Sequence, residues 1–385
     1  MKRSNERMLT THVGSLARPL ALLETMREKE NGRPYNHALF NRQVREAVAD
    51  CVKRQAEAGI DIVTDGEQGK VAFLNYVKDR LTGFEASADE PIMPESWKKE
   101  VADFPDYYHG YFNKYSAAVS PLRVLVCRGE IKYIGERDLK TDIDNLRAAM
   151  QGKSIVEGFV PSISPRGFGR NEFYANDGDY YTAVAEAMRI EYLGIVEAGF
   201  VLQVDDPWLI EILSDPTIEP PARRADAARH IEILNHALRG IPTEKIRLHT
   251  CYGLNHGPRL NDIPMSEFVD LMLAINAGAY SFEVANPRHY HEWHLWETVK
   301  LAPGKILIPG LLGHATNYVE HPEMIADYIV NYANLVGREN VIAGADCGFS
   351  SRASFAPEVH PTVAWAKLAA LTEGAALATR RLWRK

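Results

Sequence analysis

The sequence is poor in cysteine, in long apolar runs and in excess positive charge, and each shortage excludes a class of protein. Its 385 residues include only four cysteines, which do not cluster, so a disulfide framework is excluded. No segment approaches the roughly 18 consecutive apolar residues that a membrane helix needs. Lysine and arginine number 44 against 51 aspartate and glutamate residues, a formal charge of −7, which argues against nucleic-acid binding through bulk positive charge.

The N-terminal ten residues, MKRSNERMLT, are charged and lack the apolar core of a secretory signal, so we expect a cytoplasmic protein. Hydrophobic residues make up 46% of the chain and charged residues 25%, an ordinary globular composition with ample material for a core. In a reducing cytosol, isolated cysteines are inert core residues, metal ligands or nucleophiles.

One pattern recurs along the chain: an amphipathic helix, a glycine, and then a short apolar run. It predicts helices over 44–57, 181–197, 223–239, 266–276 and 322–336, which end at Gly59, Gly199, Gly240, Gly278 and Gly337. Glycine supplies the left-handed residue that closes a helix and turns the chain back. Helices that alternate with short apolar strands are typical of a parallel sheet.

The apolar runs predict eight strands, over 9–14, 60–65, 122–128, 200–205, 245–250, 279–284, 305–311 and 340–346. Eight parallel strands with intervening helices are the composition of a (β/α)₈ TIM barrel, an α/β fold. The competing fold is a doubly wound open sheet, which usually carries a glycine-rich turn after its first strand. Residues 11–15 lack the G-x-G-x-x-G spacing of that turn, so we favour the barrel.

Two regions exceed a minimal barrel. Residues 85–121 are rich in proline and aromatic residues, and residues 139–177 hold an additional helix and an additional apolar run, 155–163. We expect both to be insertions in βα loops, serving as a lid, a subunit contact in a homo-oligomer, or a small accessory layer. The chain shows no repeats or linkers, which predicts one domain over residues 1–385.

Polar residues stand where the predicted strands end, and in a barrel these ends converge on one mouth. His249 and Cys251 are two apart on one strand and therefore point to the same face, where they form half of a zinc site. Glu283 and Cys347 follow two later strands, so a barrel would gather all four side chains. A buried cysteine beside a hydrogen-bonded histidine is the commoner explanation of an isolated pair, and Cys127 suggests only packing.

These strand ends resemble the catalytic domain of cobalamin-independent methionine synthase. The resemblance runs from about Thr10 to Arg380, apart from the two proposed insertions, and implies a zinc-dependent (β/α)₈ barrel of the uroporphyrinogen-decarboxylase-like superfamily. The motifs that carry it are Gly14-Ser15, Asp65-Gly66-Glu67, Gln203-Val204-Asp205-Asp206-Pro207, His249-Thr250-Cys251, Phe282-Glu283, Gly313-His314-Ala315 and Asp346-Cys347-Gly348.

The resemblance also implies a role for each of these motifs. Zn²⁺ would be held by His249, Cys251, Glu283 and Cys347. Glu67 and Asp205 would bind the amino group of a small-molecule thiol, and the backbone of Gly14 and Ser15 its carboxylate. His314 matches the histidine that donates a proton. The second substrate would be an alkyl donor, of which a methylated folate is one candidate, and no nucleic acid or membrane partner is implied.

The chemistry of these residue types agrees with such a reaction. A free thiol is mostly protonated near neutral pH and is then a poor nucleophile, whereas a zinc-bound thiol loses its proton. Carboxylate is the weakest donor of the four for a borderline-soft metal, so Glu283 is the natural ligand to yield when the thiol arrives. The leaving atom of the alkyl donor then needs a proton, a task for His314.

Three hypotheses stay open on the sequence. The first is a zinc-dependent methyltransferase acting on homocysteine or a similar amino thiol. The second resembles epoxyalkane:coenzyme M transferase, in which an anionic thiol attacks an epoxide or another alkyl donor; it would want cations such as Arg128, Arg166 or Arg170 near the thiol tail. The third is a metal-free decarboxylase-like barrel or a binding protein. Three histidines in 288–296 resemble a second metal site, but hydrogen-bonded loop residues are the commoner state.

Overall fold

The computed structural model describes residues 1–87, 93–110, 118–120, 123–167, 169–253 and 257–383. Its main sheet has six parallel strands in the order β1 (Ile62–Val63), β4 (Glu157–Ile163), β6 (Val201–Asp205), β7 (Ile246–Thr250), β8 (Ala279–Phe282) and β9 (Ile306–Pro309). Two further segments close the ring through parallel bridges, which pair Thr11 with Ile62, Thr10 with Ala343, and Leu307 with Val341. The predicted (β/α)₈ barrel is confirmed.

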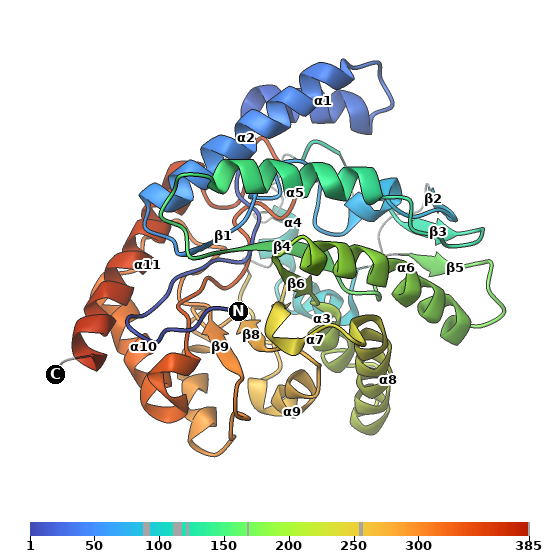
Figure 1. Cartoon of the computed structure of the whole chain (residues 1–385). Coiled ribbons are helices and arrows are strands. Elements are labelled where there is room, and N and C mark those ends of the chain that lie inside the picture. Colours follow the sequence, from blue (N-terminus) through green and yellow to red (C-terminus); the bar gives the residue numbers. More distant parts are fainter. Residues whose placement is uncertain (88–92, 111–117, 121–122, 168, 254–256, 384–385) are drawn as a thin grey trace.

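Helices run around the outside of this ring (Figure 1). The long ones are α2 (His37–Glu57), α5 (Glu136–Met150), α6 (Asp177–Glu197), α8 (Pro220–Leu238), α10 (Pro322–Val336) and α11 (Pro361–Leu382). The short helix α9 (Val269–Leu273) follows β7, the short helix α7 (Trp208–Leu213) lies between β6 and α8, and α1 (Leu20–Glu30) projects from one side. None of the helices in the described part of the chain is both long and apolar enough to cross a membrane.

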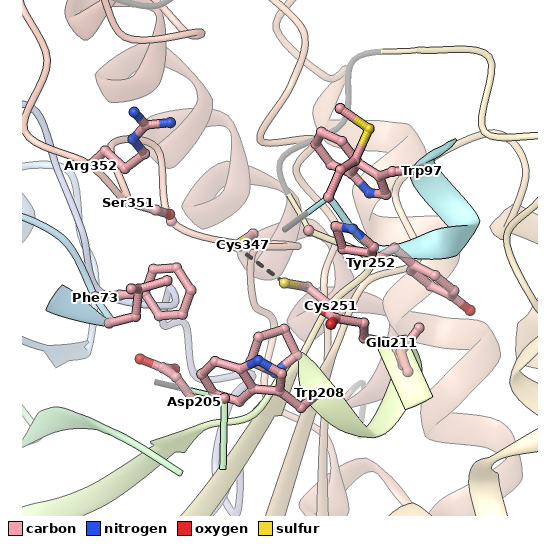
Figure 2. Close-up of a pocket in the computed structure, with 18 of the residues that line it drawn as sticks. Phe73, Trp97, Asp205, Trp208, Glu211, Cys251, Tyr252, Cys347, Ser351 and Arg352 are labelled. Atoms are coloured by element: carbon pink, nitrogen blue, oxygen red, sulfur yellow. Dashed lines mark hydrogen bonds between the residues drawn. The ribbon is translucent and has the colours of Figure 1, made fainter. Parts of the chain in front are cut away.

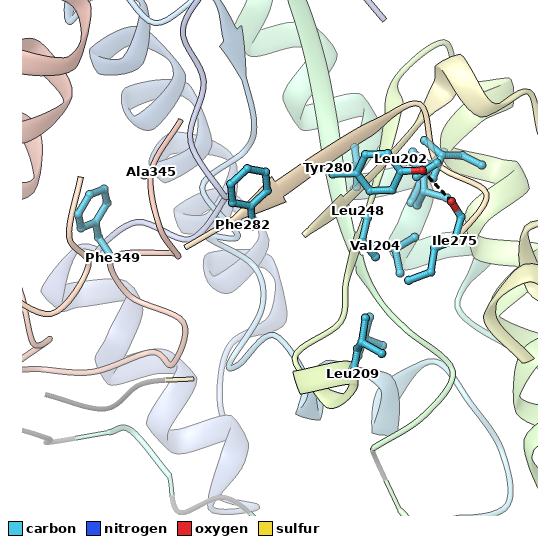
Figure 3. Packing of buried hydrophobic residues seen from close by; sticks show 14 of the residues in the cluster. Leu202, Val204, Leu209, Leu248, Ile275, Tyr280, Phe282, Ala345 and Phe349 are labelled. Atoms are coloured by element: carbon cyan, nitrogen blue, oxygen red, sulfur yellow. Dashed lines mark hydrogen bonds between the residues drawn. The ribbon is translucent and has the colours of Figure 1, made fainter. Parts of the chain in front are cut away.

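Alternation along the strands decides which side chains face the site. In β6, Leu202 and Val204 belong to the core between the sheet and the helices, together with Leu248 of β7 (Figure 3). The intervening residues therefore face the interior of the barrel, because successive strand residues point to opposite sides. Asp205 is thus an inward residue at the end of β6, and it lies in register with His249 of β7.

Four of the five predicted helix-ending glycines adopt the left-handed conformation. Gly59, Gly199, Gly240 and Gly337 have φ angles of 83°, 91°, 73° and 91°. Gly278 is needed for a different reason, because a Cβ there would lie 2.5 Å from the carbonyl oxygen of Thr243. The absence of a side chain at Gly278 allows its backbone to approach that of Thr243 closely.

The prediction of a barrel strand over 122–128 was wrong. That segment forms β3 (Leu125–Cys127), which joins β2 (Phe84–Ala86) and β5 (Arg170–Asn171) in a separate three-stranded sheet. The barrel position belongs to β4, so α5 and β4 are barrel elements and the predicted insertion 139–177 was wrong as well. The segments 122–128 and 155–163 are both short and apolar, and periodicity alone does not distinguish a barrel strand from a strand of an added sheet.

The other predicted insertion, 85–121, lies between β1 and β4 and contains α3 (Glu95–Asp103) and α4 (Pro105–Gly110). Within it, residues 88–92 and 111–117 lie outside the described part of the chain. The 3₁₀-helix η1 (Asn75–Asp79) precedes this insertion and leads into it.

A buried ionic cluster ties η1 to the outer helices. Arg80 donates to Glu191 of α6 at 2.9 Å and also pairs with Asp142 of α5. The hydroxyls of Tyr76 and Tyr133 donate to the same Glu191 carboxylate at 2.7 and 2.9 Å. Burial raises the pKa of Glu191, but the charges of Arg80 and Lys70, together with the hydrogen bonds from Tyr76 and Arg80, outweigh it and lower the pKa to about 2. Arg80 is therefore the main cation that keeps Glu191 ionised.

Replacing Arg80 by methionine is expected to lower the free energy of unfolding by about 3 to 5 kcal/mol, because it leaves two buried carboxylates without their cation. Denaturant titration at pH 7 measures this loss. The matched control is Arg128→Met, since Arg128 is an exposed arginine that also pairs with two carboxylates, and its loss should be much smaller because solvent screens exposed ion pairs. Equal losses in the two variants would contradict a structural role for the cluster.

Candidate metal centre

A cavity of about 670 Å³ lies at the carboxyl ends of the barrel strands (Figure 2). Its polar part includes Ser15, Glu67, Asp205, His249, Cys251 and Cys347. Its apolar walls include Phe73, Leu74, Met93, Pro94, Trp97, Trp208 and Tyr252. Three of these, Met93, Pro94 and Trp97, come from the described residues 93–110, which therefore contribute to one wall of the cavity.

The structure brings together three of the four predicted metal ligands. His249, Cys251 and Cys347 are buried, and their potential ligand atoms lie within 4.8 Å of one another. The Cys347 thiol donates to the sulfur of Cys251 at 3.6 Å, the contact at the centre of Figure 2. This bond lowers the pKa of Cys251 against the effect of burial, and His249 lowers it further. The cluster thus favours a thiolate at Cys251.

The histidine of this group fits a metal ligand better than a core residue. Neither ring nitrogen of His249 has a hydrogen-bond partner among the described residues, although the side chain is buried. A buried polar group without a partner is costly, and a metal ion would relieve this cost. Two sulfurs about 2.3 Å from a tetrahedral zinc ion lie about 3.8 Å apart, close to the separation found here. The donor set therefore fits zinc.

Glu283, the fourth predicted ligand, belongs to a neighbouring buried group with His314 and Asp346. Its Oε1 lies 3.1 Å from Nη2 of Arg259, and its Oε2 accepts a hydrogen bond of 3.1 Å from the backbone N–H of Tyr252. Burial raises the pKa of Glu283, but Arg259 and then His314 outweigh it, so the pKa lies below its ordinary value. The carboxylate is charged, and both of its oxygens are engaged.

Asp346 fixes the position of this second group relative to the first. Its Oδ1 accepts hydrogen bonds of 2.8 Å from the backbone N–H groups of Val284 and Ala285, directly after Glu283. Asp346 also precedes Cys347 in the chain, so it couples the ends of two strands. Asp346 stands in the motif Asp346-Cys347-Gly348, in which the sequence indicated a role for the cysteine alone.

His314 is buried in the second group and is not among the described residues that line the cavity. Its Nε2 lies 3.3 Å from the carbonyl oxygen of Gly253, which does line the cavity. The preceding Gly313 donates its N–H to Glu320 at 2.9 Å, and Glu320 is held by the buried Lys367 at 2.7 Å. This ion pair anchors the loop that carries His314.

Glu67 and Asp205 meet in the cavity as two buried carboxyl groups. Burial raises the pKa of Asp205 to about 7; His249 opposes this shift and Glu67 adds to it. Burial is also the main cause that raises the pKa of Glu67. Gln203 donates to Asp205 at 2.6 Å, whereas Oε2 of Glu67 has no partner among the described residues. Such a pair favours a cationic ligand, because a bound cation would offset the loss of hydration.

The absence of a side chain at Gly14 leaves room for the Glu67 carboxylate. A Cβ at Gly14, whose φ is 148°, would lie 2.8 Å from Oε1 of Glu67. Glu67 itself has a φ of 54°, and its backbone is held by Arg18, which donates to its carbonyl at 2.8 Å, and by Asp65, which accepts its N–H at 2.9 Å. A left-handed non-glycine residue costs roughly 1 to 3 kcal/mol and persists only where its surroundings hold it. Ser15 is equally confined, since a Cβ at Gly348 would lie 1.9 Å from its Oγ.

The arginines that an anionic thiol would need are engaged elsewhere or lie apart from the metal cluster. Arg128 is exposed and pairs with Glu85 and Glu172. Arg166 pairs with Asp226 at 2.7 Å, and neither Arg128 nor Arg166 is among the described residues lining the cavity. Arg170 lines the cavity and pairs with Glu172 at 2.7 Å. Arg123 and Arg352 also line the cavity, so it is the buried carboxyl pair Glu67 and Asp205 that favours an amino thiol.

Two of the three histidines of the 288–296 segment, His289 and His294, are hydrogen-bonded to carboxylates, the state expected from the sequence. His289 lies 3.0 Å from Asp262 and stacks on Tyr252 with ring centroids 4.1 Å apart. His294 lies 2.7 Å from Glu297 in the 3₁₀-helix η5 (Tyr290–Glu297). Among the described residues, neither belongs to a group that could hold a metal ion.

Comparisons with known proteins point to the same chemistry. Residues 8–111 match the family described as cobalamin-independent synthase, catalytic domain. Proteins named methionine synthase from Saccharolobus islandicus and Saccharolobus solfataricus are each 24% identical to the chain, with 98% of this chain and 96% of each relative covered.

Two solved structures share the fold. A B12-independent methionine synthase from Shewanella sp. W3-18-1, in complex with selenomethionine, has a TM-score of 0.72 at 19% identity, covering 98% of this chain and 99% of that one. A putative vitamin-B12 independent methionine synthase from Listeria monocytogenes has a TM-score of 0.65 at 18% identity, covering 98% and 100%. The chain is thus similar to the catalytic domain of cobalamin-independent methionine synthase over residues 8–111, and to proteins named methionine synthase over 98% of its length.

Proposed function

We propose that the protein is a methyltransferase of the cobalamin-independent methionine synthase type, which methylates the sulfur of homocysteine or a closely similar amino thiol. One observation carries this proposal: a buried His–Cys–Cys group and a buried pair of carboxyl groups line the same cavity. The first suits a thiol, and the second suits the ammonium group of the same molecule. Relatives that span nearly the whole chain support one catalytic unit over residues 1–385.

We propose Zn²⁺ as the metal, held by His249, Cys251 and Cys347, with Glu283 as the fourth ligand. When bound there, zinc lowers the pKa of the substrate thiol and keeps its sulfur nucleophilic near neutral pH. The partnerless nitrogens of His249 and the 3.6 Å sulfur pair support this set. Glu283 follows β8 directly, and its negative charge acts to raise the pKa of both Cys251 and Cys347, which supports its place beside them.

The amino acid part of the thiol would be oriented by this chain's own residues. Glu67 and Asp205 would accept hydrogen bonds from its ammonium group, which would keep both carboxyl groups ionised. The backbone at Gly14 and Ser15 would receive the carboxylate, and Ser15 lines the cavity. These contacts would hold the sulfur toward the three-residue group, so that the bound thiol is already aligned for attack.

The methyl donor would occupy the apolar part of the cavity. Its walls include Phe73 and Trp208, whose rings are tilted by 34° with centroids 6.4 Å apart, and aromatic side chains of this kind suit contact with a flat, conjugated donor such as a methylated folate. We propose His314 as the group that gives a proton to the leaving atom. Because its Nε2 contacts the Gly253 carbonyl, that contact must open before the ring reaches the cavity.

Cys251→Ser and Cys347→Ser are each expected to reduce the zinc content of the purified protein from about one ion per chain to a small fraction, because serine is a poor ligand for zinc. Elemental analysis after dialysis measures this. Cys127→Ser is the matched control, since Cys127 is a buried cysteine in β3 and away from the cavity. If both cysteine variants hold zinc as the parent protein does, the ligand assignment is wrong.

Glu67→Gln is expected to keep its zinc and to raise the dissociation constant for homocysteine by about tenfold to a hundredfold, since a hydrogen bond to a charged group contributes about 1.5 to 3 kcal/mol. Calorimetric titration measures it. Binding of 4-mercaptobutanoate, the same thiol without its amino group, should stay unchanged. A parallel loss for both thiols would place Glu67 outside the amino-group site.

A further inference from the structure

Glu283 makes contacts that its proposed role as a metal ligand does not explain. Its carboxylate is buried; Oε1 lies 3.1 Å from Nη2 of Arg259 in an ion pair, and Oε2 accepts a hydrogen bond of 3.1 Å from the Tyr252 N–H. The other three candidate ligands form a separate group with one another. A carboxylate that is to bind a metal would have to leave this cationic partner.

Arg259 is itself firmly placed. Its Nε donates to Asp262 at 2.7 Å, and its backbone N–H donates to Glu100 of α3 at 3.1 Å. The guanidinium lies over the ring of Tyr252, 5.4 Å from the centroid. The residue has a φ of 60°, a conformation that costs a bulky side chain roughly 1 to 3 kcal/mol and that persists because these contacts hold it.

The surrounding charges make Arg259 and the metal competitors for one carboxylate. Asp346 lies in the same group as Glu283, so two buried carboxyl groups stand close together. Among the described residues, Arg259 is the arginine or lysine that pairs with Glu283. When Glu283 binds the metal, this ion pair is lost; when it returns, the pair is regained.

We propose that Arg259 is a positioning residue that receives Glu283 when a thiol takes its place on the metal. This inference rests on the proposed zinc site. In the exchange one metal–oxygen bond breaks and one metal–sulfur bond forms, the carboxylate leaves as an anion, and the thiol proton goes to solvent. The charge of the donor set is unchanged, and the carboxylate moves to a guanidinium already in position.

The exchange has two linked consequences. Arg259 stabilises the state in which Glu283 is off the metal, so it weakens metal binding by the thiol-free protein. By the same amount it strengthens thiol binding, because the coupling between two ligands is reciprocal. Removing the guanidinium should therefore shift the two affinities in opposite directions, which a merely structural arginine would not do.

The test uses Arg259→Met in the full chain. The dissociation constant for Zn²⁺ is measured by competition with a chromophoric chelator, and that for homocysteine by calorimetry on the zinc-loaded protein. We expect zinc to bind about tenfold more tightly and homocysteine about tenfold more weakly, the scale of one charge-assisted hydrogen bond. Arg259→Lys keeps a cation and should therefore shift both dissociation constants in the same directions as Arg259→Met, but by a smaller factor. This variant provides the test if Arg259→Met does not fold.

Two controls isolate the contact with Glu283. Arg352→Met removes another arginine of the cavity lining and should leave the zinc constant unchanged. In a Glu283→Gln background, Arg259→Met should no longer tighten zinc binding, because the carboxylate it acts on is gone. An unchanged zinc constant in both Arg259→Met and Arg259→Lys, or a shift of the same size in the Glu283→Gln background, overturns the inference. Failure of the parent protein to bind zinc would instead overturn the proposed function.

Discussion

The site depends on the burial of one imidazole and two thiols, whose potential ligand atoms lie within 4.8 Å of one another. His249 and Cys251 share a face because they are two apart on β7, and ring closure brings Cys347 beside them. Polar groups in this state are costly in a folded protein. A metal ion offsets the cost, and the sulfur donors favour zinc over the harder cations Mg²⁺ and Ca²⁺.

Charge is distributed around this centre in two different ways. At the cavity, burial raises the pKa values of Glu67 and Asp205, and no arginine pairs with either carboxyl group among the described ion pairs. In the second buried group, Arg259 neutralises the charge of Glu283, and backbone N–H groups hold Asp346. The pair Glu67 and Asp205 therefore suits a cationic group that arrives with the substrate, whereas the contact with Arg259 suits a Glu283 carboxylate that moves.

Local patterns predicted most of the barrel and part of the site. Helix–glycine–strand units fixed the order of the elements, and the spacing of His249 and Cys251 predicted their common face. The sequence did not distinguish β4 from the run at 122–128, because both are short, apolar and followed by loops. Arg259 carried no signal either: its pairing with Glu283 joins two loops across the barrel mouth, and such contacts follow from tertiary packing rather than from periodicity.

X-ray absorption at the zinc edge tests the central claim most directly, because it counts the sulfur atoms around the metal without any substitution in the chain. For the thiol-free protein we predict two sulfur neighbours at about 2.3 Å together with nitrogen and oxygen neighbours. With homocysteine bound we predict three sulfur neighbours and one oxygen fewer. A spectrum without sulfur neighbours, or one that homocysteine leaves unchanged, would contradict the account.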